Sequence, residues 1–247
     1  QNLKNEAVIH AELANDLSKV LNEKIFVVPR VYSDELIELE YSYLDDFNKT
    51  LDSHIPIFYC GKKIISETNK NFELETIKKT TSNKIIFWDN LYANDYCPKR
   101  IFIGPYFGRI GFKNTMINPT GLINTDLFIL DLINIYNHDK NLQTSWNKIL
   151  KKYKIPFQFS IICRYLFPVN FKQENHEKIY NFNEEIEALD FLLWKWKNPL
   201  AREWYQYLLI LKHNLQLVNG SMDMERIEKV FPVPLKDTLL KLNLEDK

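Results

Sequence analysis

Residues 85–109 decide the fold, and they read IIFWDNLYANDYCPKRIFIGPYFGR. The stretch begins with an apolar run, so residues 84–88 are predicted to form a short buried strand. The chain then changes character, because residues 88–96 hold three aromatic and four Asn or Asp side chains. Such a group after a strand indicates either a polar turn or the edge of a ligand site. The residue types alone do not decide between the two.

Further short strands and helices flank this stretch in alternation. Apolar runs predict strands at residues 25–28, 55–59 and 114–117. Between and around them, helical spacing of apolar residues predicts helices at residues 6–21, 34–51, 72–80 and 125–136. Continuously apolar strands that alternate with helices are typical of a parallel sheet covered by helices. The first part of the chain, residues 1–140, is therefore expected to be an α/β domain.

The rest of the chain, residues 141–247, is expected to be helical. Strand signals fade there, and residues 182–218 predict a long helix that breaks near Asn198 and Pro199. Residues 224–244 predict a short helix and a loop. Five aromatic residues at near-helical spacing are expected to pack in the helical core, with an aromatic binding strip as the alternative. They are Trp194, Trp196, Trp204, Tyr205 and Tyr207.

Polar or aromatic residues follow each of the four predicted strands. The first strand leads to Tyr32, the second to Cys60 and Gly61, the third to Trp88 and Asn90, and the fourth to Asn118. In a (β/α) barrel the active site forms at the carboxyl ends of the strands. Aromatic faces there would suit the apolar faces of a sugar ring, and amides would suit its hydroxyls. Turn chemistry explains any one of these endings equally well.

Composition excludes several functional classes. Lys+Arg and Asp+Glu are 32 each, so no net charge attracts nucleic acid or a membrane surface. No apolar run approaches the roughly 20 residues of a membrane span. The five histidines and three cysteines have no metal-ligand spacing, and the cysteine usage favours a reducing, cytoplasmic compartment.

Residues 85–109 also resemble a segment of a known protein family. They are similar to the W-D-N, A-N-D-Y and G-P-Y-x-G-R segment of glycoside hydrolase family 84, the β-N-acetylglucosaminidases that include protein O-GlcNAcase. Residues 10–16, 29–32, 59–61 and 116–119 also resemble family segments, in the same order. The resemblance covers about residues 5–140. It implies the second half of a (β/α)8 TIM-type barrel, followed by the helical post-catalytic region, and it implies no cofactor.

The resemblance also implies roles for individual residues. Tyr32 and Trp88 would line the pocket for the acetamido group, with Cys60 near its methyl. Asn90 would support the acetamido group or the residue that polarises it. The ring hydroxyls would bond to Asp95 and Asn118. Two departures lie at the pocket edge, since Val28 and Val31 replace a Cys and an acidic residue of the family pattern and Cys60 replaces a Thr.

Chemistry in this family is implied to be substrate-assisted and retaining, with the acetamido oxygen as nucleophile and an adjacent Asp pair as polarising residue and general acid. That pair is expected before Gln1, so no catalytic residue is expected in this chain and the chain alone is expected to be inactive. Asp45 and Asp46 are adjacent, but they are expected on a solvated helix face. The expected partner is a GlcNAc-bearing glycan or an O-GlcNAc-modified protein. The alternatives are a non-catalytic GlcNAc-binding module and a helical adaptor.

Overall fold

The computed structural model describes residues 3–21, 24–37, 42–66, 74–93, 101–105, 114–167 and 180–219. The chain forms two compact units, which are described separately. The first comprises residues 1–91 and 108–118, and the second comprises residues 92–107 and 119–247. The predicted domain boundary at residue 140 falls inside the second unit, because the helix at residues 123–139 belongs there. The assignment of residues 1–140 to a barrel half stays a prediction.

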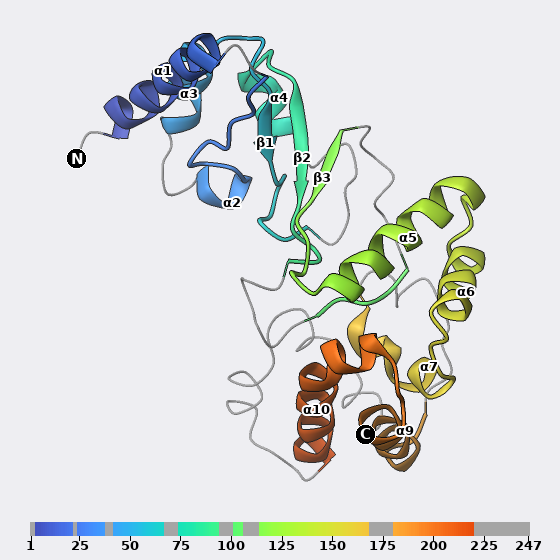
Figure 1. Ribbon diagram of the computed structural model, residues 1–247. Helices are drawn as coiled ribbons and strands as arrows, with labels where there is room; N and C mark the ends of the chain where they lie inside the picture. Colours follow the sequence, from blue (N-terminus) through green and yellow to red (C-terminus); the bar gives the residue numbers. More distant parts are fainter. Residues whose placement is uncertain are drawn as a thin grey trace. The chain divides into compact units, whose positions relative to one another are not determined.

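Among its described residues, the first unit contains three parallel strands and four helices (Figure 1). Strand β1 (Ile57–Tyr59) pairs with β2 (Ile85–Asp89), which pairs with β3 (Thr115–Ile117). The predicted strand at residues 25–28 is reduced to one bridge between Val27 and Ile57. The helices are α1 (Leu3–Leu21), α2 (Asp34–Ile37), α3 (Tyr43–Thr50) and α4 (Glu75–Thr80). The helix predicted over residues 34–51 is therefore two helices, with residues 38–41 outside the described ranges.

The two faces of this sheet differ in what covers them. Side chains alternate along a strand, so Ile57, Tyr59 and Phe87 share one face and join a buried core with α1, α3 and α4. The other face carries Phe58 and Trp88, whose ring centroids are 6.3 Å apart. Phe26 packs on Phe58 with the centroids 5.7 Å apart, and its side chain is 45% exposed. The helix-covered face thus contributes the buried core of the unit. The second face carries aromatic side chains and is less covered.

The second unit is helical in every element that the structure describes. It comprises α5 (Ile123–Asp139), α6 (Leu142–Lys152), α7 (Gln158–Ile162), the 3-10 helix η2 (Cys163–Leu166), α9 (Phe182–Trp194) and α10 (Pro199–Asn219). The predicted break near Asn198 and Pro199 is confirmed. Asn198 accepts a hydrogen bond from the Leu200 N–H, and Pro199 occupies the first helical position, where its missing N–H costs nothing. The prediction for residues 224–244 lies outside the described ranges.

Aromatic side chains form the core of the helical unit. Trp204 is fully buried, and its ring lies 5.2 Å from Phe159, 5.6 Å from Trp196 and 5.8 Å from Phe128. The expected core role is confirmed for Trp196, Trp204 and Tyr207, which are all buried. Trp194 is 56% exposed and contacts Tyr205. The helical spacing is therefore a packing pattern with one aromatic side chain at its surface.

Among the described helices, none has the length and apolar character needed to cross a membrane.

Candidate functional site

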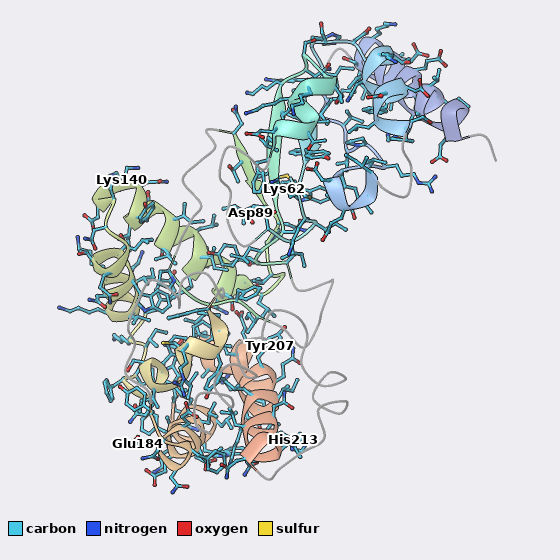
Figure 2. The ribbon with its side chains drawn as sticks, turned by 180° about the vertical axis from the view of Figure 1, so that it is seen from behind. Lys62, Asp89, Lys140, Glu184, Tyr207 and His213 are labelled. Carbon is cyan, nitrogen blue, oxygen red and sulfur yellow. The ribbon has the colours of Figure 1, made fainter. Side chains whose placement is uncertain are left out.

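Polar side chains follow the carboxyl ends of the three adjacent strands and lie close together. Cys60, Asn90 and Asn118 each lie two residues beyond Phe58, Trp88 and Met116, which occupy the face away from the helices. Alternation along a strand therefore carries the three polar side chains to this same face. Figure 2 marks this end of the sheet with Asp89, the last residue of β2, and Lys62, in the loop after β1.

The three side chains are joined by hydrogen bonds. The Asn90 Nδ2 donates to the Cys60 Sγ at 3.2 Å and to the backbone carbonyl of Ile64 at 3.1 Å. The Asn118 Nδ2 donates to the Asn90 Oδ1 at 3.1 Å. We call these three side chains and the Ile64 carbonyl the Asn90 network. It connects the ends of the three described strands of the sheet, and Asn90 at its centre is only 8% exposed.

Backbone bonds hold the strand ends that carry this network. The Asn118 N–H donates to the Asp89 carbonyl at 2.9 Å, and the Cys60 N–H donates to the Tyr32 carbonyl at 2.7 Å. The Asp89 Oδ1 accepts from the Leu91 N–H at 3.1 Å, which forms a turn directly after β2. The turn chemistry expected for this loop is therefore present, together with the side-chain network.

Burial keeps the thiol of Cys60 protonated. Cys60 is 1% exposed, and burial together with the nearby Asp89 carboxylate raises the pKa of its thiol to about 12, although the hydrogen bond from Asn90 opposes this shift. A neutral thiol is a weak acceptor that adds no charge. Cys60 can therefore provide a small apolar surface and hold an amide, but it does not supply a thiolate nucleophile.

Two aromatic rings lie beside the network. The centroids of Tyr32 and Trp88 are 5.7 Å apart at an interplanar angle of 51°. Both side chains are only partly exposed. The indole N–H of Trp88 is buried, and no residue in the described part of the chain accepts a hydrogen bond from it. The site thus combines ring surfaces with amides, as ligands with both apolar and hydroxyl groups require.

A second set of contacts fixes the loop between β1 and α4. The Tyr59 hydroxyl donates to Asp34 Oδ1 at 2.5 Å, and the Thr76 hydroxyl donates to Asp34 Oδ2 at 2.8 Å. Burial, and then the bond to Asp34, raises the pKa of Tyr59 above its ordinary value. The Ile64 N–H donates to Glu35 Oε2 at 2.8 Å. Helix α2 therefore holds this loop through Asp34 and Glu35, two residues that the sequence did not single out.

The structure brings five of the six predicted site residues together at these strand ends: Tyr32, Cys60, Trp88, Asn90 and Asn118. The sixth, Asp95, lies outside the described residues. Asp45 and Asp46 are in the first turn of α3, and Asp45 is exposed. The backbone carbonyl of Ile64 was missed, because no sequence pattern shows which main-chain group faces a side chain.

No group of three or more His, Cys, Asp or Glu side chains within the described ranges is arranged to hold a metal ion. The described part of the site consists of neutral amides, a thiol and aromatic rings. Such groups recognise a ligand by hydrogen bonding and ring contact.

Comparisons with known proteins find similar sequences and a similar fold. A family model described as beta-N-acetylglucosaminidase matches residues 1–120. Protein O-GlcNAcase of Rattus norvegicus and that of Mus musculus are each 36% identical to this chain over 82 residues. Each of these matches covers 31% of this chain and 9% of the relative, so the chain spans only a small part of the curated proteins it resembles.

A solved structure described as "Structure of CpGH84B" has a similar fold. Its TM-score with this chain is 0.63 at 15% identity, and the match covers 97% of this chain and 50% of that chain. The family match contains the whole described sheet and the Asn90 network, since these end at Asn118. Residues 1–120 are therefore similar to the beta-N-acetylglucosaminidase family, and the fold of the chain is similar to that of the solved structure.

Proposed function

We propose that this chain is part of a β-N-acetylglucosaminidase and that its strand ends bind the N-acetylglucosamine residue. The three strands of the sheet unit would form part of the second half of a (β/α)8 barrel, with the helical unit as the post-catalytic region. The natural ligand would be a GlcNAc-bearing glycan or an O-GlcNAc-modified protein, as the name of the curated relatives suggests.

The Asn90 network is the observation that carries this proposal. Three parallel strands present Cys60, Asn90 and Asn118 on one face, and the rings of Tyr32 and Trp88 lie beside them. In this arrangement Tyr32, Trp88 and Cys60 surround the acetamido group, and Asn118 bonds to ring hydroxyls together with Asp95. A buried neutral thiol suits the acetamido methyl, because it offers a small apolar surface without charge.

The described residues are proposed to bind the sugar and not to cleave its bond. Retaining substrate-assisted hydrolysis needs a carboxylate that polarises the acetamide and a general acid beside it. The adjacent pair Asp45 and Asp46 lies in the first turn of α3, and the Asp89 carboxylate is buried and holds a turn. None of these is placed as such a pair, so the 247-residue chain is expected to bind N-acetylglucosaminides without hydrolysing them.

Calorimetric titration of the 247-residue chain tests the binding role. Methyl β-N-acetylglucosaminide should bind more tightly than methyl β-glucoside, which lacks the acetamido group. The Trp88→Ala and Asn118→Ala variants should each bind about tenfold more weakly, because each loses a contact worth about 1.4 kcal/mol. Trp194→Ala is the matched control, since that Trp is exposed on α9 in the helical unit.

Several results would contradict the proposed function. Equal affinity for the two glycosides, or equal loss in Trp88→Ala and Trp194→Ala, would contradict a GlcNAc site at the strand ends. Hydrolysis of an aryl N-acetylglucosaminide by the chain would contradict the division between binding and cleavage. Binding without hydrolysis also fits the second candidate, a non-catalytic GlcNAc-binding or interaction module, which the absence of a suitably placed carboxylate pair in the described ranges favours.

A further inference from the structure

The orientation of the Asn90 side-chain amide is fixed by its neighbours. A backbone carbonyl can only accept a hydrogen bond, so the group that lies 3.1 Å from the Ile64 oxygen has to be the Asn90 nitrogen. The same nitrogen lies 3.2 Å from the Cys60 Sγ. Its two hydrogens are thus both directed into the protein, toward Ile64 and Cys60. Asn90 consequently has no N–H left for a ligand.

This orientation determines how Asn118 is presented. The Asn90 Oδ1 faces Asn118 and can only accept, so Asn118 has to direct its Nδ2 toward it, at 3.1 Å. The Asn118 side chain keeps one N–H and its own Oδ1. Within the described ranges, only Asn90 bonds to the Asn118 side chain, which is partly exposed where Asn90 is buried. One donor and one acceptor therefore remain available at the edge of the site.

We propose that Asn90 is a positioning residue that fixes the amide orientation of Asn118, so that Asn118 presents its Oδ1 and one N–H to hydroxyl groups of the bound sugar. The inference rests on the proposed function, and it changes the role expected of Asn90 from direct support of the acetamido group to support of Asn118. A sugar hydroxyl both donates and accepts, so an amide held in one orientation distinguishes hydroxyl positions that a freely rotating amide would not.

The groups that hold Asn90 are themselves fixed. Ile64 donates its N–H to Glu35 Oε2 of α2 at 2.8 Å, and Cys60 is held by its own N–H on the Tyr32 carbonyl. The network is thus held in place at Ile64 and at Cys60, and its last member is Asn118. Because a flipped Asn90 would place its carbonyl oxygen against the Ile64 oxygen, the alternative amide orientation of Asn118 is disfavoured through the whole network.

Asn83 provides a matched control at the other end of β2. It is 7% exposed where Asn90 is 8% exposed, and its Nδ2 also makes two bonds, to the carbonyls of Asp52 at 2.8 Å and of Ile55 at 2.9 Å. Asn83→Ala removes a buried amide of the same size that also donates two hydrogen bonds, from the same unit. Effects of Asn90→Ala that Asn83→Ala lacks therefore report positioning and not general stability.

The first measurement is made on the unliganded 247-residue chain by NMR of the side-chain amide protons. Asn90→Ala should shift the Asn118 side-chain resonances and speed their exchange with water, because the Asn118 N–H loses its acceptor. Asn83→Ala should leave these resonances in place, and Cys60→Ser should do the same because the hydroxyl keeps an acceptor for Asn90. Unchanged Asn118 resonances in Asn90→Ala would overturn the inference without any reference to sugar binding.

The second measurement is a double-mutant cycle with methyl β-N-acetylglucosaminide and its 3-, 4- and 6-deoxy analogues. Asn118→Ala should lower the affinity about tenfold and abolish discrimination at one hydroxyl position. Asn90→Ala should reduce the same discrimination, and the double variant should bind within about twofold of Asn118→Ala. Asn83→Ala should keep the discrimination of the wild type.

The outcomes are distinguishable. A double variant about tenfold weaker than Asn118→Ala would show that Asn90 contacts the sugar independently, which overturns the inference and leaves the proposed function in place. Absence of binding by the wild-type chain would overturn the proposed function and the inference that rests on it. Non-additive affinities together with shifted Asn118 resonances would support both.

Discussion

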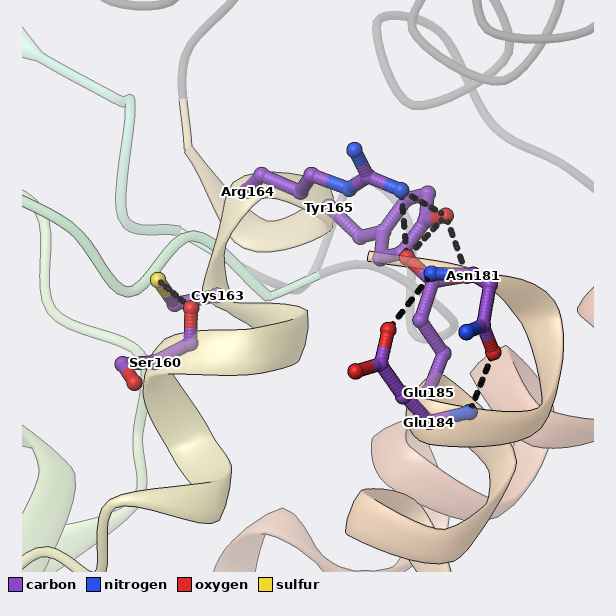
Figure 3. Close-up of polar contacts among 7 residues, drawn as sticks. All are labelled: Ser160, Cys163, Arg164, Tyr165, Asn181, Glu184 and Glu185. Carbon is purple, nitrogen blue, oxygen red and sulfur yellow. Dashed lines mark hydrogen bonds and ion pairs between the residues drawn. The ribbon is translucent and has the colours of Figure 1, made fainter. Parts of the chain in front are cut away.

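The two compact units each contain a buried polar cluster, and the two clusters are built differently. In the sheet unit, the Asn90 network is neutral and ends at the partly exposed Asn118. In the helical unit, Arg164 and Tyr165 of η2 meet Glu185 of α9 (Figure 3). All three of these residues are at most 8% exposed, and Arg164 forms an ion pair with Glu185.

Several hydrogen bonds join the three side chains of the helical cluster. The Tyr165 hydroxyl lies 2.9 Å from both carboxylate oxygens of Glu185 and accepts from Arg164 Nη2 at 3.1 Å. Burial and the nearby carboxylate raise the pKa of Tyr165, with Arg164 opposing them. The difference teaches that burial of polar groups does not by itself indicate a ligand site. The helical cluster joins η2 to α9 through a buried ion pair, whereas the Asn90 network keeps a donor and an acceptor at a partly exposed edge, where a ligand can bond.

The largest expected effect comes from breaking the buried ion pair between Arg164 and Glu185. Glu185→Ala should lower the free energy of unfolding of the helical unit by about 3–5 kcal/mol, because it leaves the Arg164 guanidinium buried without its counter-charge. Chemical denaturation followed by near-UV circular dichroism measures this change.

A charge-free replacement is the control for Glu185→Ala. The double variant Arg164→Met and Glu185→Leu removes both charges at similar volume, and it should recover most of the lost stability. If Glu185→Ala and this double variant were equally destabilised, the loss would come from packing and not from an unpaired charge. Sugar affinity should stay unchanged in every variant of this cluster that folds.

The next expected effect is slow alkylation of Cys60, the buried thiol of the Asn90 network. A pKa of about 12, raised from an ordinary value of 9.0, lowers the thiolate fraction at neutral pH by about a thousandfold. Iodoacetamide should therefore label Cys60 about a thousandfold more slowly in the folded chain than in guanidinium chloride. Site-resolved mass spectrometry measures the two rates. Labelling of folded Cys60 at the rate of a free thiol would contradict this, because it would show that the thiol is accessible and ionises normally.

The strand ends were predictable because they follow the alternation of the sheet. Phe58, Trp88 and Met116 share one face, so the residues two positions later had to share it as well. The three paired strands, which apolar runs predict, are confirmed, with ends within two residues of those predicted. Residues 25–28 were overpredicted, because only Val27 pairs with β1 and Pro29, which lacks an N–H, soon follows.

Other features depend on contacts that no local pattern contains. The bond from Asn90 to Ile64 requires knowledge of where a backbone carbonyl points. Helix α6 was not predicted, although Asn141 caps it by accepting from the Thr144 N–H at 2.8 Å. Its start was hidden because Lys140 ends α5 in the left-handed region at φ 56°, a conformation expected of Gly or Asn.

The smallest expected effect tests a second polar contact of the helical unit, at the start of α5. The Glu203 carboxylate of α10 accepts from the backbone N–H and the side chain of both Asn124 and Thr125, at 2.7–2.9 Å. Two N–H groups of the first helical turn are thus satisfied by a negative charge, as a helix N-terminus favours. Glu203→Ala should lower the free energy of unfolding by about 1–2 kcal/mol.

Stability of the wild type should also depend on pH through Glu203. Burial raises the pKa of this carboxyl, but the hydrogen bonds from Thr125 and Asn124 outweigh burial and hold it below its ordinary value of 4.5. A depressed pKa stabilises the fold above 4.5, and this contribution is lost as the pH falls through the folded-state value. The free energies of unfolding of wild type and Glu203→Gln should therefore differ at pH 7 and converge in acid.

Glu187→Gln, at an exposed position of α9, is the control and should have the wild-type free energy of unfolding at every pH. A constant difference between wild type and Glu203→Gln down to the lowest pH would show that the contact depends on the shape of the side chain and not on its charge.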